Sequence, residues 1–146
     1  MAKPKVFVDS SVLIAATLSV SGGSSRLLTG MGQFFDFVIN DYVLGESLMV
    51  LTHKFQDSAH LKSHLLSLLG AGEVAVLKNP SAKLVKSTAR IIDLTDAPIL
   101  AGALDDCNYL VTLDNDFFSP DVLTYRGLRN LKIVKPKELI AAAPLP

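Results

Sequence analysis

Acidic side chains follow two of the most strand-like segments of this 146-residue sequence. Asp9 comes directly after "KVFV" (Lys5–Val8), and Asp114 and Asp116 come just after the core of "YLVTL" (Tyr109–Leu113). Two carboxylates that stand one position apart at the end of a buried strand repel each other. The spacing therefore indicates one of two arrangements: a solvated turn, or a site in which a cation lies between the carboxylates.

A third segment brings another carboxylate to the same place. Asp96 opens a helical segment that leads into "YLVTL", and the first turn of a helix favours an anion. Ligands of open parallel sheets bind beyond the carboxyl ends of the strands, so we expect Asp9, Asp96, Asp114 and Asp116 at one edge. Oxygen ligands without histidine or cysteine predict a hard cation, Mg²⁺ or Mn²⁺. One or two such ions support phosphodiester hydrolysis.

The elements that must position these residues alternate between strands and helices, which is typical of a parallel sheet covered on both faces. We expect strands at Lys5–Val8, Phe34–Asn40, Glu73–Leu77, Tyr109–Leu113 and Leu131–Lys135. We expect helices at Ser11–Ser19, from Arg26, at Asp41–Phe55, at Ser58–Gly70, within 79–90, at Asp96–Asp106 and from Pro136. The sequence thus predicts a single α/β domain over residues 1–146: a three-layer α/β/α fold with a central, mostly parallel sheet of about five strands.

Three details of this prediction concern the ends of helices. "SGGSS" at Ser21–Ser25 is expected to be a loop; it lacks the phosphate-loop patterns GK[ST] and GxGxxG. Gly70 is expected to end its helix in the left-handed conformation. Thr95 is expected to cap the helix that begins at Asp96.

The composition limits the classes of function. The chain has 14 basic and 14 acidic side chains, which argues against a protein that coats nucleic acid electrostatically but not against an enzyme that acts on it. No apolar run approaches the ~20 residues of a membrane span, and the N-terminus lacks the shape of a signal peptide. The single cysteine, Cys107, fits a reducing compartment. We therefore expect a cytoplasmic protein that has no membrane partner.

Four segments in order, "VFVDSSVLIAATLS", "ESLMVL", "DAPILAGAL" and "YLVTLDNDF", resemble the PIN-domain ribonucleases. The resemblance extends from Lys5 to Leu139 and is strongest to the VapC-like toxin components of prokaryotic toxin–antitoxin systems. It implies a Mg²⁺- or Mn²⁺-dependent endoribonuclease that acts on single-stranded RNA. The implied metal-binding and catalytic residues are Asp9, Glu46, Asp96 and Asp114, with Asp116 as a further ligand. Ser10 and Thr112 match hydroxyl positions that orient carboxylates or a water.

The same resemblance implies partners. Toxins of this branch form a homodimer and bind a small antitoxin protein, and we expect the apolar helices Val43–Phe55 and Leu61–Leu69 to supply these surfaces. Without the resemblance, Glu46 stands in the exposed middle of a helix and is the least determined member of the set.

Several other residues have less specific explanations. Asp105 lies half a turn out of phase with Asp96 on its helix, and Asp93 is expected to lie in a loop. His60 and His64 have the spacing of a zinc pair but lack a third ligand. The basic residues of 126–137 are interpreted as either a guide for an RNA backbone or a solvated edge.

Two other classes of function compete with the nuclease. The first is a non-catalytic PIN-like module that binds RNA or a protein; the complete acidic set argues against it. The second is a phosphotransfer protein with an acidic pocket. A phosphatase of that kind requires a second aspartate after the first strand, where this chain has "DSS".

Overall fold

The computed structural model describes residues 2–144, except the side chain of Arg126. Its centre is one sheet in the order β3-β2-β1-β4-β5, and every neighbouring pair of strands is parallel. The strands are β1 (Lys5–Val8), β2 (Asp36–Ile39), β3 (Ala75–Val76), β4 (Tyr109–Val111) and β5 (Lys132–Val134). β1 is the middle strand, and the chain adds β2 and β3 on one side and β4 and β5 on the other. The strand order therefore reverses between β1 and β4, which is where ligands bind in open α/β sheets.

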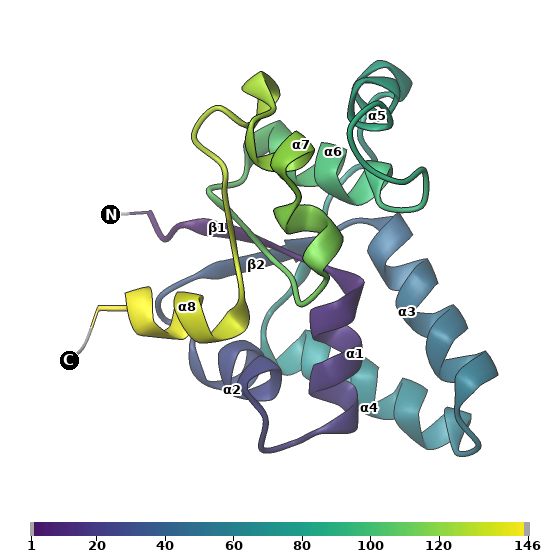
Figure 1. Cartoon of the computed structure of the whole chain (residues 1–146). Coiled ribbons are helices and arrows are strands. Elements are labelled where there is room, and N and C mark those ends of the chain that lie inside the picture. Colours follow the sequence, from purple (N-terminus) through teal and green to yellow (C-terminus); the bar gives the residue numbers. More distant parts are fainter. Residues whose placement is uncertain (1, 145–146) are drawn as a thin grey trace.

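Helices cover both faces of this sheet, as the figure shows (Figure 1). The helices are α1 (Ser10–Leu18), α2 (Gly23–Gly30), α3 (Asp41–Lys54), α4 (Ser58–Ala71), α5 (Ala82–Thr88), α6 (Ala97–Asp106), α7 (Pro120–Leu123) and α8 (Pro136–Ala142). Two 3₁₀ turns, η1 (Asn115–Phe118) and η2 (Arg126–Leu128), lie between β4 and β5. α1, α2, α4 and α8 lie below the sheet in this view, and α5, α6 and α7 lie above it. The predicted three-layer α/β/α architecture is confirmed.

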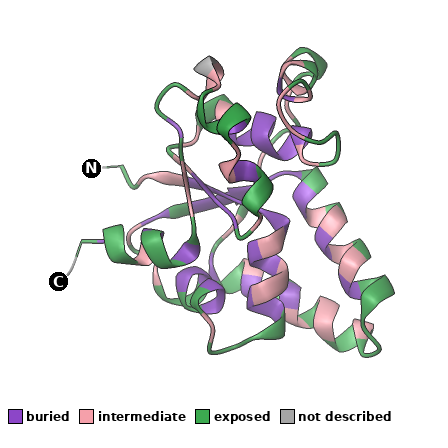
Figure 2. Cartoon of the chain, viewed as in Figure 1, coloured by how far each residue is buried: buried purple, intermediate pink, exposed green. Residues whose placement is uncertain are grey.

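β1 and α6 each contribute an unbroken run of buried residues to the core. The three residues from Val6 to Val8 are completely buried, and the first seven residues of α6 are buried as well (Figure 2). Each large side chain transferred into such a core contributes about 1.5–3 kcal/mol. The two elements meet at Gly102, where an added Cβ would lie 2.9 Å from Phe7 Cε2 and 2.6 Å from Asn40 Nδ2. A rigid core thus supports the strand that leads to Asp9 and the helix that begins after Asp96.

The loop predicted at Ser21–Ser25 is wrong in its second half. Gly22 is the N-cap of α2, and the helix already includes Gly23, Ser24 and Ser25. The two serines are buried, at 6% and 3% exposure, because this first turn packs into the layer that α1 and α8 also form. Tertiary packing has overridden the weak helix propensity of a Gly/Ser segment.

Two predicted helix ends are also wrong. Asp96, not Thr95, is the N-cap residue of α6. Gly70 lies within α4, which continues to Ala71, and the left-handed residue after the helix is Glu73, with φ of 50°. Gly72 is buried there because its backbone approaches Leu28; an added Cβ would lie 3.0 Å from the Leu28 carbonyl oxygen.

Among the described residues, no single helix is long and apolar enough to cross a membrane. α1 and α2 meet the requirements of length and composition only together, as a pair bent by 98°.

Candidate metal centre

Asp9 lies at the carboxyl end of β1, in the N-cap position of α1, and is 2% exposed. Its backbone N–H donates to the Val111 carbonyl of β4, which joins the two central strands at this edge. Its Oδ2 accepts hydrogen bonds from Ser11 Oγ at 2.6 Å and from Thr112 Oγ1 at 2.7 Å. Thr112, one of the two hydroxyl residues predicted beside the site, therefore donates a hydrogen bond to one of the predicted carboxylates.

Ser11 is a residue that the sequence analysis missed. Besides donating to Asp9, its Oγ accepts a 3.0 Å hydrogen bond from the Leu113 backbone N–H. It thus connects the start of α1 with the segment that follows β4. The only sequence signal was a hydroxyl two positions after Asp9, and its second partner lies 102 residues away in the chain.

Glu46 lies on α3, half-buried, and accepts a hydrogen bond from Ser10 Oγ. The predicted hydroxyl at Ser10 therefore holds Glu46 more closely than Asp9, from which it is 3.5 Å. Asn40 fixes the start of α3: its Oδ1 accepts from the Val43 N–H at 3.1 Å, and its Nδ2 donates to the Pro98 carbonyl of α6 at 3.2 Å. The helices that carry Glu46 and Asp96 are held in register by this buried amide.

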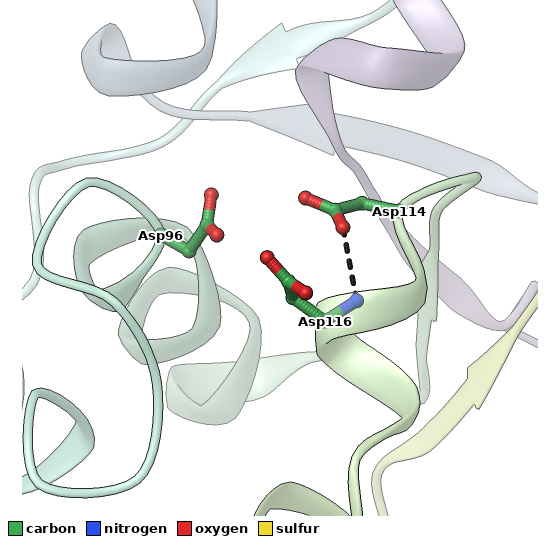
Figure 3. A group of neighbouring side chains, drawn as sticks. All are labelled: Asp96, Asp114 and Asp116. Carbon is green, nitrogen blue, oxygen red and sulfur yellow. Dashed lines mark hydrogen bonds between the residues drawn. The ribbon is translucent and has the colours of Figure 1, made fainter.

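Asp96, Asp114 and Asp116 form a compact group in which one oxygen of each lies within 4.8 Å of the others. The three side chains point toward one another from two separate segments (Figure 3). Asp114 caps η1 by accepting a 2.9 Å hydrogen bond from the Asp116 N–H. The side chain of Asp96 makes no capping bond to its own helix, which leaves its oxygens free to face the other two.

This donor set fits a hard divalent cation. Mg²⁺ holds oxygen ligands at about 2.0–2.1 Å, so two ligands of one ion lie at most about 4.2 Å apart. Three oxygens that lie within 4.8 Å of one another are therefore near enough to share one ion after small side-chain adjustments. All the donors are oxygens, and the cluster is partly open to solvent, as an ion that retains waters requires. The cluster contains Asp116, whereas Asp9 and Glu46 lie outside it and are engaged by hydroxyls.

The carboxylates of the site repel one another, and partial burial makes the ionised form of Asp96 still less favourable. The pKa of Asp96 is raised to about 7, first by partial burial and then by the negative charges of Asp114, Asp9, Glu46 and Asp116. Burial also raises the pKa of Asp9, although its hydroxyl and backbone donors oppose this effect. In the described structure the ion pairs are Lys3–Asp36 and Lys5–Asp106, so neither neutralises the cluster. A bound cation would relieve this repulsion.

The other titratable candidates lie outside this group. Asp105 and Asp93 are exposed, and Asp106 pairs with Lys5 at 2.8 Å, which lowers the pKa of Asp106. Burial raises the pKa of the Cys107 thiol to about 12, so this residue is a poor nucleophile.

His60 and His64 stay without a third ligand among the described residues. The Nδ1 atom of His64 lies 2.8 Å from the Thr17 carbonyl oxygen, so this ring has a structural partner.

Comparison with solved structures gives the same fold at low sequence identity. A chain of VapBC2 from Rickettsia felis, crystallised with a DNA fragment from the promoter, matches with a TM-score of 0.66 and 18% identity; the match covers 90% of this chain and 98% of that one. PAE2754 from Pyrobaculum aerophilum matches with a TM-score of 0.67 and 19% identity, over 94% and 88% of the two chains. VapC20 from Mycobacterium tuberculosis, a sarcin-ricin loop cleaving toxin, matches with a TM-score of 0.57 and 19% identity, over 77% and 92%.

No family model matches the chain, and no curated protein matches it in sequence. The three structural matches nevertheless confirm the resemblance to PIN-domain, VapC-like proteins at the level of the fold. These identities show the fold alone.

Proposed function

We propose that this protein is a Mg²⁺- or Mn²⁺-dependent endoribonuclease that hydrolyses phosphodiester bonds of single-stranded RNA. The observation that carries the proposal is the cluster of Asp96, Asp114 and Asp116, which lies at the edge of a PIN-like sheet where the strand order reverses. VapC20, which shares this fold, is a sarcin-ricin loop cleaving toxin. Asp116 is exposed, so the cluster is open to solvent on its side.

A divalent cation in this cluster would lower the pKa of a water molecule and stabilise negative charge on the phosphate. Asp96, Asp114 and Asp116 would hold the cation, and Asp9 and Glu46 would complete the acidic surface around it. Thr112 and Ser11 fix one oxygen of Asp9, and its other oxygen lies 3.5 Å from Ser10 Oγ. Ser10 donates a hydrogen bond to the Glu46 carboxylate. These hydroxyls hold the carboxylates in place before the substrate arrives.

Cleavage of a labelled single-stranded RNA tests the proposal. The parent protein should cleave it with Mn²⁺ or Mg²⁺ and not with EDTA. Asp114→Asn should reduce the rate by at least about a hundredfold, since it removes a ligand charge from the cluster. Asp105→Asn is the matched control: it removes an exposed carboxylate from the helix that follows Asp96, and it should cleave like the parent.

Two results contradict the proposal. If Asp114→Asn and the parent cleave RNA equally fast, the cluster is not the active site. If no divalent cation binds to the parent in calorimetry and no RNA is cleaved, the protein is a binding module with a PIN-like fold.

We also propose that the protein is the toxin of a toxin–antitoxin pair, forms a homodimer and binds a small antitoxin protein. VapBC2, which has the same fold, is a complex of two components. α3 and α4 expose Tyr42, Met49 and Leu66 at 47%, 57% and 59%, and these apolar side chains suit a protein partner. Light scattering of the purified chain tests the dimer; a monomer at high concentration would contradict it.

A further inference from the structure

A hollow lies on the same face of the molecule as α1, α2 and α8. Its volume is about 330 Å³, and its lining is largely apolar, with Ala15, Leu113 and Pro136 among the residues that form it. α1, α2 and α8 lie together below the sheet (Figure 1). We call this hollow the α2 pocket, because the first turn of α2 forms one wall of it.

The first turn of α2 offers unused donors to this pocket. Within the described residues, the backbone N–H groups of Gly23, Ser24 and Ser25 make no hydrogen bond, and the N-cap residue, Gly22, has no side chain that could accept one. An added Cβ at Gly23 would meet no atom within 4 Å, so the space beside this turn is open. The positive end of an α-helix dipole and its free N–H groups favour an anion.

Ser24 is a second feature of this turn that could bind a ligand. The residue is 6% exposed and lines the α2 pocket, yet its hydroxyl has no hydrogen-bond partner in the part of the chain that the structure describes. Its oxygen is not sealed from solvent, because no fully buried side-chain oxygen or nitrogen lacks a partner there. Because Ser24 lines the pocket, this hydroxyl is available to an oxygen of a bound group.

The charge of the α2 pocket matches an anion as well. Lys135 and Lys137 line it, and no carboxylate does. Glu138, the acidic residue nearest to these lysines in the sequence, is exposed and accepts a hydrogen bond from the Lys135 backbone N–H. The Lys135 ammonium lies 5.6 Å from the centre of the Phe118 ring, which places this side chain on the η1 side of the pocket.

The pocket adjoins the candidate metal centre through Leu113. This residue lines the pocket, and its backbone N–H donates to Ser11, which in turn holds Asp9. The acidic centre repels a polyanion unless cations screen it, and the α2 pocket supplies positive charge beside it.

We propose that the α2 pocket binds a backbone phosphate of the RNA strand, next to the phosphate at the metal centre. The N–H groups of Gly23 and Ser24, the Ser24 hydroxyl and the two lysines would hold the phosphate oxygens, and the apolar lining would contact the sugar. This inference rests on the proposed nuclease function, since it names how that substrate is held. Contiguity with the metal centre favours RNA over the carboxylate of a protein partner.

Binding of a short, labelled single-stranded RNA to the whole protein in EDTA tests the pocket without cleavage. The double variant Lys135→Gln/Lys137→Gln should bind at least about fivefold more weakly, and the slope of log K against log salt should shrink by about 0.7 for each phosphate that the variant no longer neutralises. Ser24→Ala should also weaken binding and leaves the charge unchanged. Lys132→Gln is the matched control: Lys132 is the first residue of β5, the strand that precedes Lys135, and it does not line the pocket, so the variant should bind like the parent.

Equal affinity and equal salt slope for the parent, the double variant and Ser24→Ala would overturn the proposal even if the protein cleaves RNA with Mn²⁺. If the parent binds RNA through these residues but cleaves none, the nuclease function fails and the phosphate site stands. Amide NMR shifts of Gly23 and Ser24 then identify the ligand. Shifts with a ribodinucleotide support the proposal, whereas shifts only with an acidic peptide assign the pocket to a protein partner and overturn it.

Discussion

Thr112 Oγ1 lies 2.7 Å from Asp9 Oδ2, although the two residues are 103 positions apart in the chain. The same hydroxyl accepts a 3.0 Å hydrogen bond from the Asp114 backbone N–H. One completely buried side chain therefore links the carboxylate that follows β1 to the segment that presents two members of the three-aspartate cluster.

Removing this hydroxyl should weaken both the fold and the metal site. Thr112→Val keeps the shape but removes one of the hydrogen-bond donors of the buried Asp9 carboxylate and leaves the Asp114 N–H without this acceptor, which should lower the free energy of unfolding by roughly 1–3 kcal/mol. Loss of an orienting group typically reduces metal affinity by about 10–100-fold. Urea denaturation and Mn²⁺ calorimetry measure these effects. Thr112→Ser retains the hydroxyl and should restore most of both; equal losses in the serine variant would mean that the hydroxyl is not responsible.

The raised pKa of Asp96 predicts how stability depends on pH when EDTA removes metal. At a pH between the unfolded value of 3.8 and the folded value of about 7, the folded chain keeps a proton on Asp96 that the unfolded chain has lost. The stabilisation is therefore fully present below the unfolded pKa and is lost as pH rises through about 7. The raised pKa of Asp9 acts in the same direction.

Melting temperatures in EDTA across this pH range test the prediction. The parent should lose more stability than Asp96→Asn as the pH rises, because asparagine has no proton to release. Saturating Mn²⁺ should reverse the trend, since the cation binds the ionised carboxylates. If Asp96→Asn and the parent show the same pH dependence in EDTA, Asp96 does not have a raised pKa.

Two glycine substitutions should have opposite effects on stability. Gly102→Ala places a methyl group 2.6 Å from Asn40 Nδ2 and 2.9 Å from the buried Phe7 ring, so it should destabilise the fold by about 1–3 kcal/mol. Gly45 lies in the middle of α3, where an added Cβ meets no atom within 4 Å. Gly45→Ala should stabilise by about 0.5–1 kcal/mol. Chemical denaturation of both variants measures these effects; a neutral Gly102→Ala would contradict the close packing of Phe7 and Asn40 against α6.

The sheet and most helices could be predicted from the sequence because their signals are local. Asn40, for instance, ends an apolar strand and caps α3 through the Val43 N–H, as its residue type predicts. The helix ends at Ser21–Ser25, Gly70 and Thr95 were predicted wrongly, because packing of distant segments decides them. Gly72, for example, is required by the approach of the Leu28 carbonyl, which no local pattern reveals.

The sequence could indicate which carboxylates belong to the candidate site, but not how they are arranged. Sequence spacing and the family resemblance indicated all five carboxylates, and the site role of each stays a prediction. Spacing could not show that the turn η1 would direct Asp116 toward Asp96, or that Ser10 would hold Glu46. Ser11 escaped notice because its importance depends on the Leu113 backbone, which reaches it only in the folded chain.

This geometry predicts which carboxylates matter most for metal affinity. Asp116 belongs to the cluster, whereas Glu46 lies outside it and is bound by Ser10. Asp116→Asn should therefore weaken Mn²⁺ binding by at least about tenfold, or about 1.4 kcal/mol, and Glu46→Gln should weaken it less. Calorimetric titration of both variants measures the difference, with Asp121→Asn, an exposed carboxylate on α7, as the control that should bind like the parent. The reverse order, with Glu46→Gln more harmful than Asp116→Asn, would place the cation nearer α3 and Asp9 than the three-aspartate cluster.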